Sequence, residues 1–139
     1  MNNRLSAPIK DYADSDKEKG PAVLVEGWLS DPMLAAAKAQ PKVSQQMRTF
    51  LTQNAAGILS TPFMSPPNIP TPSLSDFTMP TFVVVGDHDD PEIVERSRTM
   101  SREIPGATLT VIQDAGHMVN LERPREFNRA LAAFLRSLK

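Results

Sequence analysis

A proline-rich stretch divides the regular structure of this chain into two parts. Residues 61–80, TPFMSPPNIPTPSLSDFTMP, carry six prolines. Proline lacks the backbone N–H that a helix interior or a central strand requires, so neither can run through this stretch. We therefore predict that residues 61–79 form an extended, ordered connection over a surface, with regular structure before and after it.

The part before the connection is predicted to be helical. Residues 1–20 are polar and charged and are expected to form an arm, whereas residues 21–60 are rich in alanine. Prolines suited to the first helical position favour helices that begin near residues 21, 32 and 41. The third helix is expected to end near Asn54, with an apolar face made of Val43, Met47, Phe50 and Leu51.

The part after the connection alternates between predicted strands and helices. The run TFVVVG, residues 81–86, is β-branched without alternation, which favours a strand buried on both faces. A second strand is expected over 107–112. Helices are expected over 91–104 and 124–138, and each has one apolar stripe. The first stripe is Ile93, Ser97, Met100 and Ile104, and the second is Phe127, Leu131, Phe134, Leu135 and Leu138.

This alternation predicts an α/β fold with a mostly parallel sheet and right-handed crossovers. In such sheets, functional residues gather in the loops that follow the carboxyl ends of the strands. Two such loops exist here, GDHDDPE (86–92) and QDAGHMVN (113–120). Because they follow consecutive strands, we expect their side chains to meet.

The acidic loop allows three interpretations. A metal site would need Asp87, His88, Asp89 and Asp90 to converge, but consecutive loop residues point in different directions, and we predict no metal. A phosphoacceptor receiver domain would need further strands, and the chain is too short after Asp89. The third interpretation pairs one aspartate with His117, which follows the next strand, as the acid and base of a serine-type triad.

The competing interpretations of these residues are structural. Asp89 could instead cap the helix that opens at Pro91, and His117 alone could be an ordinary loop histidine. Asp87 and Asp90 are expected to be turn and helix-terminus charges, His88 a surface turn residue and Asp114 the start of a turn. Glu122 and Arg123 are expected to hold the loop before Pro124.

From Trp28 onward, the chain resembles the α/β-hydrolase superfamily. MPTFVVVGDHDDPE is similar to the strand and turn that carry the catalytic acid there, three residues after a glycine. GATLTVIQDAGHMVNLERPREFNRALAAFL is similar to the last strand, histidine turn and final helix. The resemblance implies that Asp89 is the acid and His117 the base, that 21–60 form a helical cap segment, and that 80–139 are the C-terminal part of a mostly parallel hydrolase sheet.

The resemblance also implies a substrate and a pocket. The closest likeness is to members with a small cap that cleave esters or lactones, and no cofactor is expected. Trp28 and Met118 are candidate pocket residues, although each is equally explained by core packing.

The motif that carries the family's serine nucleophile is missing from this sequence. None of the glycines at 20, 27, 57, 86, 106 and 116 flanks a serine in a G-x-S-x-G elbow, and GILST (57–61) is the nearest imitation. We therefore expect the chain to be inactive alone. It is predicted to need complementation by a missing N-terminal half or by a second copy of itself, because a two-stranded sheet leaves edges unpaired. The alternative is a non-catalytic truncated fragment or self-associating interaction module.

Composition limits the remaining possibilities. The chain has 139 residues, a formal net charge of −1 and no cysteine. One domain is expected, with no nucleic-acid partner, no thiolate chemistry and no membrane span, and the expected location is the cytoplasm.

Overall fold

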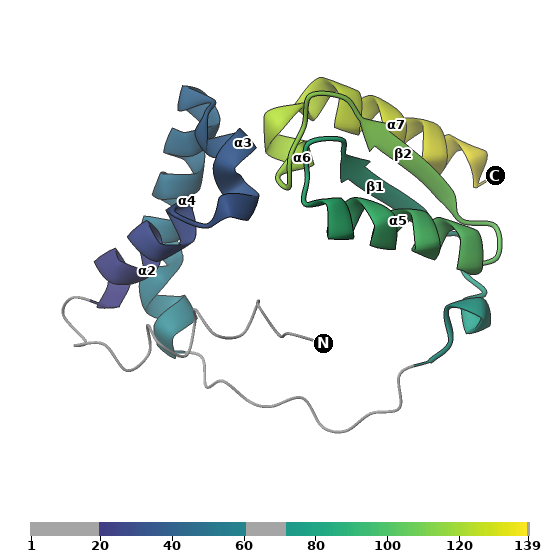
Figure 1. Cartoon of the computed structure of the whole chain (residues 1–139), viewed down its shortest axis with the longest axis horizontal. Helices are drawn as coiled ribbons and strands as arrows, with labels where there is room; N and C mark the ends of the chain where they lie inside the picture. The colour runs from purple at the N-terminus through teal and green to yellow at the C-terminus, as the bar shows by residue number, and fades with distance from the viewer. Residues whose placement is uncertain (1–19, 61–71, 139) are drawn as a thin grey trace.

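The computed structural model describes residues 20–60 and 72–138. They form two parts: a helical part before the proline-rich connection and an α/β part after it (Figure 1). Residues 61–71 of the connection, residues 1–19 of the predicted N-terminal arm, and Thr61 of the GILST stretch (57–61) lie outside the described residues.

The helical part contains two longer helices with a short turn between them. These elements are α2 (Gly20–Leu29), the 3₁₀ turn η1 (Pro32–Leu34), α3 (Ala35–Lys38) and α4 (Pro41–Ser60). Asp31 caps η1 by accepting from the Met33 N–H at 2.9 Å. The starts of η1 at Pro32 and of α4 at Pro41 agree with the starts predicted from these prolines. The end of α4 was predicted too early, because the helix continues through Gly57 to Ser60.

A single apolar core holds these helices together. It comprises Leu24, Val25, Leu29, Ala37, Val43, Met47, Leu51 and Ala55. The prediction for Phe50 was wrong, because this side chain is 62% exposed. The buried residues of α4 follow the i, i+4 row from Val43 to Ala55. This row is inclined to the helix axis, so the buried face turns away from Phe50 along the helix. Phe50 therefore lies at the solvent-exposed edge of the row.

The α/β part contains one pair of parallel strands in the described residues. Its elements are η2 (Leu74–Asp76), β1 (Phe82–Gly86), α5 (Pro91–Glu103), β2 (Thr108–Ile112), α6 (Val119–Glu122) and α7 (Pro124–Ser137). Figure 1 shows α5 on one side of the strand pair and α7 on the other. Val83 and Val85 are buried, and the half-buried Val84 joins a small cluster with Phe127 of α7, so both faces of β1 are covered.

The apolar side chains of α5 and α7 are less buried than the sequence predicted. Met100 of α5 and Leu135 and Leu138 at the end of the chain are exposed, and no residue of α7 is fully buried. Both helices have the apolar stripes that the sequence predicted, but a two-stranded sheet is too narrow to cover them. The loop predicted over 113–120 is also shorter than expected, because the short helix α6 begins at Val119.

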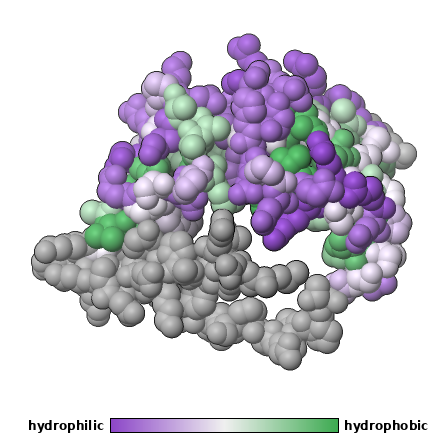
Figure 2. Space-filling model, viewed as in Figure 1, coloured by the Kyte–Doolittle hydropathy of each residue, from purple (hydrophilic) through white to green (hydrophobic). Residues whose placement is uncertain are grey.

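The two parts meet where α3 approaches α6. Met118 and Leu121 pack against the apolar core of the helical part. The face seen in Figure 2 is hydrophilic over much of its area, with separate apolar patches. Among the described residues, no helix combines the length and the apolar character needed to cross a bilayer.

Candidate active site

The register of the strands brings the two predicted loops to the same edge of the sheet. Gly86, the last residue of β1, pairs with Ile112, the last residue of β2. Immediately beyond this pair, the Asp87 N–H donates to the Ile112 carbonyl at 3.1 Å, and the His88 N–H donates to the Ala115 carbonyl at 2.9 Å. The loops therefore leave the sheet hydrogen-bonded to each other, as the parallel pairing predicted.

Gly86 allows this close approach. A Cβ atom built at Gly86 would lie 2.0 Å from the Ala115 carbonyl oxygen and 2.4 Å from that of Gly116. Both atoms belong to backbone and cannot rotate away, so any side chain at this position would force the loops apart. The glycine that marked the acid turn in the sequence therefore has a packing role.

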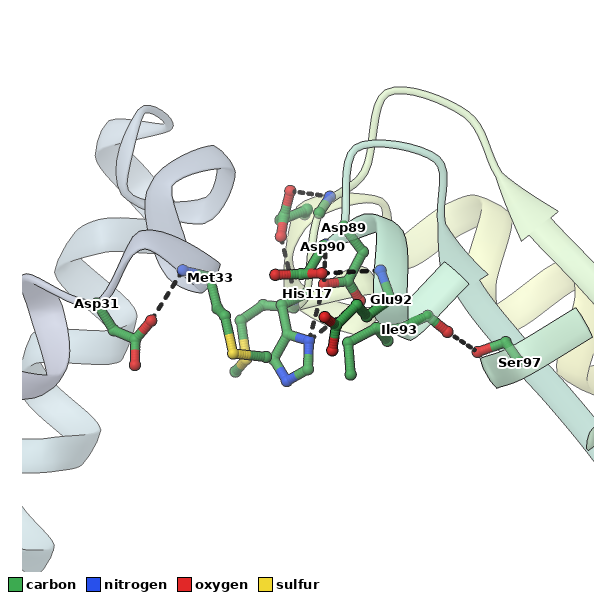
Figure 3. A network of polar contacts seen from close by, with 11 residues as sticks. Asp31, Met33, Asp89, Asp90, Glu92, Ile93, Ser97 and His117 are labelled. Carbon is green, nitrogen blue, oxygen red and sulfur yellow. Dashed lines mark hydrogen bonds and ion pairs between the residues drawn. The ribbon is translucent and has the colours of Figure 1, made fainter. Parts of the chain in front are cut away.

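Asp89 and His117 form a pair at this edge. His117 Nδ1 lies 3.1 Å from Asp89 Oδ1 and 3.0 Å from Oδ2 (Figure 3). An ionised carboxylate only accepts hydrogen bonds, so Nδ1 is the donor and Nε2 keeps the lone pair. The Asp89 side chain is 4% exposed and that of His117 is 36% exposed. The acid is thus buried behind the imidazole, which remains open to an incoming molecule.

The other polar residues of the acidic loop have separate partners. Asp90 is the N-cap of α5 and accepts from the Glu92 N–H at 2.8 Å, so the capping role considered for Asp89 belongs to its neighbour. Asp87 Oδ1 accepts from the Ala115 N–H at 3.3 Å. His88 is exposed. Within the described ranges, no group of three metal-ligating side chains is placed to hold an ion.

The loop that carries His117 is held by Glu122. One carboxylate oxygen of Glu122 accepts from the Gly116 N–H at 2.8 Å, and the other accepts from the Met118 N–H at 2.9 Å. The sequence predicted that Glu122 holds this loop, but the two amides that it binds were not predicted.

The helical part faces the imidazole. Met33, in η1, points toward His117 (Figure 3). Met118 packs beneath the helices, and Trp28 packs against the same apolar core from α2. Met33 was not identified from the sequence, and its only signal was its position next to the Asp31-Pro32 cap.

Among the side chains that the structure describes, no serine hydroxyl forms a hydrogen bond with His117. Four of them instead donate to backbone carbonyls three or four residues earlier in the chain: Ser30, Ser97, Ser101 and Ser137. The described residues therefore contain a hydrogen-bonded aspartate–histidine pair, and no serine hydroxyl among them is paired with that histidine.

Comparison with known proteins identifies the family. The model of the alpha/beta hydrolase family matches residues 3–130, which is most of the chain and extends upstream of the resemblance noted from Trp28. The chain belongs to the alpha/beta hydrolase family. The α/β fold and the family membership predicted from the sequence are thus confirmed.

The proteins that this alpha/beta hydrolase chain resembles are longer than the chain itself. It is 36% identical over 62 residues to the protein named "Putative carbamate hydrolase RutD" from Pseudomonas syringae pv. syringae (strain B728a), an alignment covering 45% of this chain and 24% of that protein. Two solved structures share its fold. MenH from S. aureus matches with a TM-score of 0.68 at 20% identity, over 94% of this chain and 49% of that one.

The second structure is a hydrolase from Pseudomonas aeruginosa PA01, with a TM-score of 0.54 and 24% identity over 93% of this chain and 48% of that one. The alpha/beta hydrolase chain therefore spans about half the length of the solved structures it matches. At these identities, the structural matches establish the fold alone.

Proposed function

We propose that this chain supplies the acid and the base of a serine-dependent acyl hydrolase. The observation that carries the proposal is the contact between the buried Asp89 carboxylate and the half-exposed His117 imidazole, on loops that follow adjacent parallel strands. The family's chain order of serine, acid and histidine fits the order of these two residues.

The geometry supports a defined role for each group. With Nδ1–H directed at Asp89, Nε2 of His117 would accept the proton of a serine hydroxyl as the serine oxygen attacks the substrate carbonyl carbon. The same proton would then pass from Nε2 to the leaving oxygen or nitrogen as its bond to carbon breaks. Water would repeat the sequence on the acyl-serine and regenerate the hydroxyl. Asp89 would stabilise the imidazolium formed in both steps.

The substrate class follows from the surroundings of the imidazole. Met33 points toward His117, and Met118 follows His117 in the chain. Both are flexible apolar side chains suited to a small, largely apolar acyl or alcohol group. Esters and lactones are the first candidates. Carbamates join them because a partly similar protein is named as a carbamate hydrolase.

Hydrolysis of p-nitrophenyl acetate and butyrate tests the proposal. The chain alone is expected to give the buffer rate, because no serine elbow is found in its sequence. Co-expression with the N-terminal half of a family member that carries the elbow is expected to produce turnover. His117→Ala should abolish that turnover, since a triad histidine contributes several orders of magnitude to rate.

His88→Ala is the matched control, because His88 is the chain's other histidine and is exposed in the neighbouring loop, which follows β1. It should retain turnover. Equal rates for wild type and His117→Ala in the complemented enzyme would refute the assignment of the base. If the isolated chain proves active, labelling with a fluorophosphonate would identify the serine that supplies the attack.

A second candidate function is self-association without catalysis. It is favoured by the exposure of Leu135 and Leu138 at the C-terminal end and by the absence of fully buried residues in α7. Sedimentation velocity is expected to show a concentration-dependent dimer that Leu135→Lys weakens, because a charge would enter an apolar contact. Asn128→Lys, an exposed polar position of α7, should leave the dimer intact. A wild-type monomer at all concentrations would exclude this function.

A further inference from the structure

Glu122 is a buried carboxylate that the proposed catalysis does not use. It is 4% exposed, and both of its oxygens accept backbone N–H groups. The donors are Gly116 and Met118, the residues immediately before and after His117. The carboxylate thus binds the backbone on either side of the proposed catalytic base.

We propose that Glu122 is a positioning residue that fixes the backbone of His117 so that its imidazole meets Asp89. This inference rests on the proposed role of His117 as the base. Two hydrogen bonds from one rigid carboxylate restrict the peptide units on both sides of a residue. The χ1 rotation that remains is then limited by the contact with Asp89.

The bonding pattern differs from ordinary helix capping. The Met118 N–H bond closes the start of α6, a helix of four residues, and Met118 is its N-cap. Capping the start of α6 would need only the bond from the Met118 N–H to Glu122. The second oxygen reaches past His117 to Gly116, which lies outside the helix, so the carboxylate spans the histidine and does not only end the helix.

The charge of Glu122 strengthens this clamp. Among the described residues, no arginine, lysine or histidine nitrogen forms an ion pair with the Glu122 carboxylate, although Arg123 lies next to it and pairs with Asp114 at 3.8 Å. A buried carboxylate without a counter-ion is costly unless hydrogen bonds to N–H groups offset its desolvation. Such charge-assisted bonds are shorter and stronger than neutral ones, which suits a group that must hold a loop rigidly.

Packing prevents the loop from avoiding the clamp. A Cβ atom at Gly116 would lie 2.7 Å from the Cβ of Ala36 in α3 and 3.3 Å from a Glu122 oxygen. On the other side, the Ala115 N–H is bound by Asp87. Gly116 therefore lies between the helical part and the carboxylate, with too little space on that side for a side chain.

Glu122→Gln tests the proposal with nearly unchanged shape. Glutamine offers one acceptor oxygen, and its NH₂ group would face the second N–H donor, so one of the two bonds must be lost. In ¹⁵N NMR of the full chain, neutral His117 is expected to be mainly the Nδ1–H tautomer in wild type, because Asp89 accepts that proton. In Glu122→Gln, this tautomer should cease to be dominant. The freed amide of Gly116 or Met118 should exchange roughly 10- to 100-fold faster.

Two controls separate positioning from general destabilisation. Glu126→Gln makes the same chemical change at an exposed site in the first turn of α7, and it should change neither signal. Leu51→Ala removes buried packing in the helical part and should lower the stability of the chain while leaving the His117 tautomer unchanged.

An unchanged His117 tautomer in Glu122→Gln would overturn the proposal, as would an equal change in Leu51→Ala. If Glu122→Gln does not fold, wild-type exchange decides the matter: unprotected amides at Gly116 and Met118 would refute the clamp, and protected ones would support it. These readouts need no turnover, so a failure of the proposed hydrolysis leaves them interpretable.

Discussion

The two parts of the molecule hold themselves together in different ways. The helical part, residues 20–60, has a continuous apolar core of eight buried side chains. In the α/β part, residues 72–138, the buried apolar side chains are fewer and are divided: Ile112, Ala115 and Val119 form a small cluster near α7, and Val83, Val85 and Ile104 are buried outside that cluster. Yet the α/β part has the candidate site. Its loops are ordered by a close contact at Gly86 and by N–H groups that donate to the carboxylates of Asp87, Asp89 and Glu122, so polar contacts supplement packing where chemistry is proposed.

The largest effect should come from the contact at the sheet edge. Gly86→Ala places a Cβ atom 2.0 Å from a backbone oxygen, and relief requires the two loops to separate. We expect a loss of about 3 kcal/mol in the free energy of unfolding, at the upper end of the usual cost of overpacking, together with loss of the Asp89–His117 contact. Urea denaturation and the ¹⁵N signals of His117 would measure the two effects.

Gly57→Ala is the control for this change. Among the described residues, no atom lies within 4 Å of a Cβ atom built at Gly57, and the residue lies inside α4. Alanine in a helix interior should therefore stabilise the chain by about 0.5–1 kcal/mol. If the two variants had similar stability, the site would not depend on the close approach at Gly86, and the contrast between the two parts would fail.

The second effect tests the packing of the helical part. Leu51 and Phe50 are neighbours in α4, but Leu51 is 3% exposed and Phe50 is 62% exposed. Leu51→Ala should lower the free energy of unfolding by about 2–5 kcal/mol through lost burial and the cavity left behind. Phe50→Ala should change it by less than about 0.5 kcal/mol. Thermal and urea unfolding followed by circular dichroism would compare them.

Similar losses in these two variants would show that Phe50 is covered by another surface, such as a second copy of the chain. This outcome would move Phe50 from solvent into an interface and would enlarge the apolar contact of the helical part. It is therefore a direct test of whether that part is complete by itself.

The sequence predicted the contact between Asp89 and His117 better than it predicted burial. Asp89 and His117 could be paired because parallel strands that are consecutive in the chain present their carboxyl ends together, and this depends only on topology. The prediction for Phe50 failed because helical spacing defines a face and not how far a neighbouring helix covers it. Leu135 was misjudged for a related reason, since its stripe fits a wider sheet than the two strands described.

Other features of the site depend on contacts that residue spacing does not encode. The approach of Met33 to His117 is set by how the helical part packs on the α/β part through α3 and α6. The hydrogen bond that the Gly116 N–H donates to Glu122 requires α6, a helix too short to leave a periodic pattern. Both are consequences of tertiary structure.

The smallest effect should come from an exposed ion pair within the helical part. Glu26 of α2 and Arg48 of α4 are joined through a carboxylate–guanidinium contact, with a second bond at 3.3 Å. The hydrogen bond from Arg48 holds the pKa of Glu26 below its usual value. The unfolded chain therefore binds a proton at higher pH than the folded chain does. Any stabilisation by the pair is present above the unfolded pKa and is lost as the pH falls through the folded pKa.

Glu26→Gln should therefore be slightly less stable than wild type at pH 7, and the difference should vanish at acidic pH and in high salt, because both side chains are more than half exposed. Urea unfolding at several pH values would measure it. A difference that persists in acid would show that Glu26 contributes by its shape. A difference as large as that of Leu51→Ala would show that the helices of this part depend on polar contacts as much as the α/β part does.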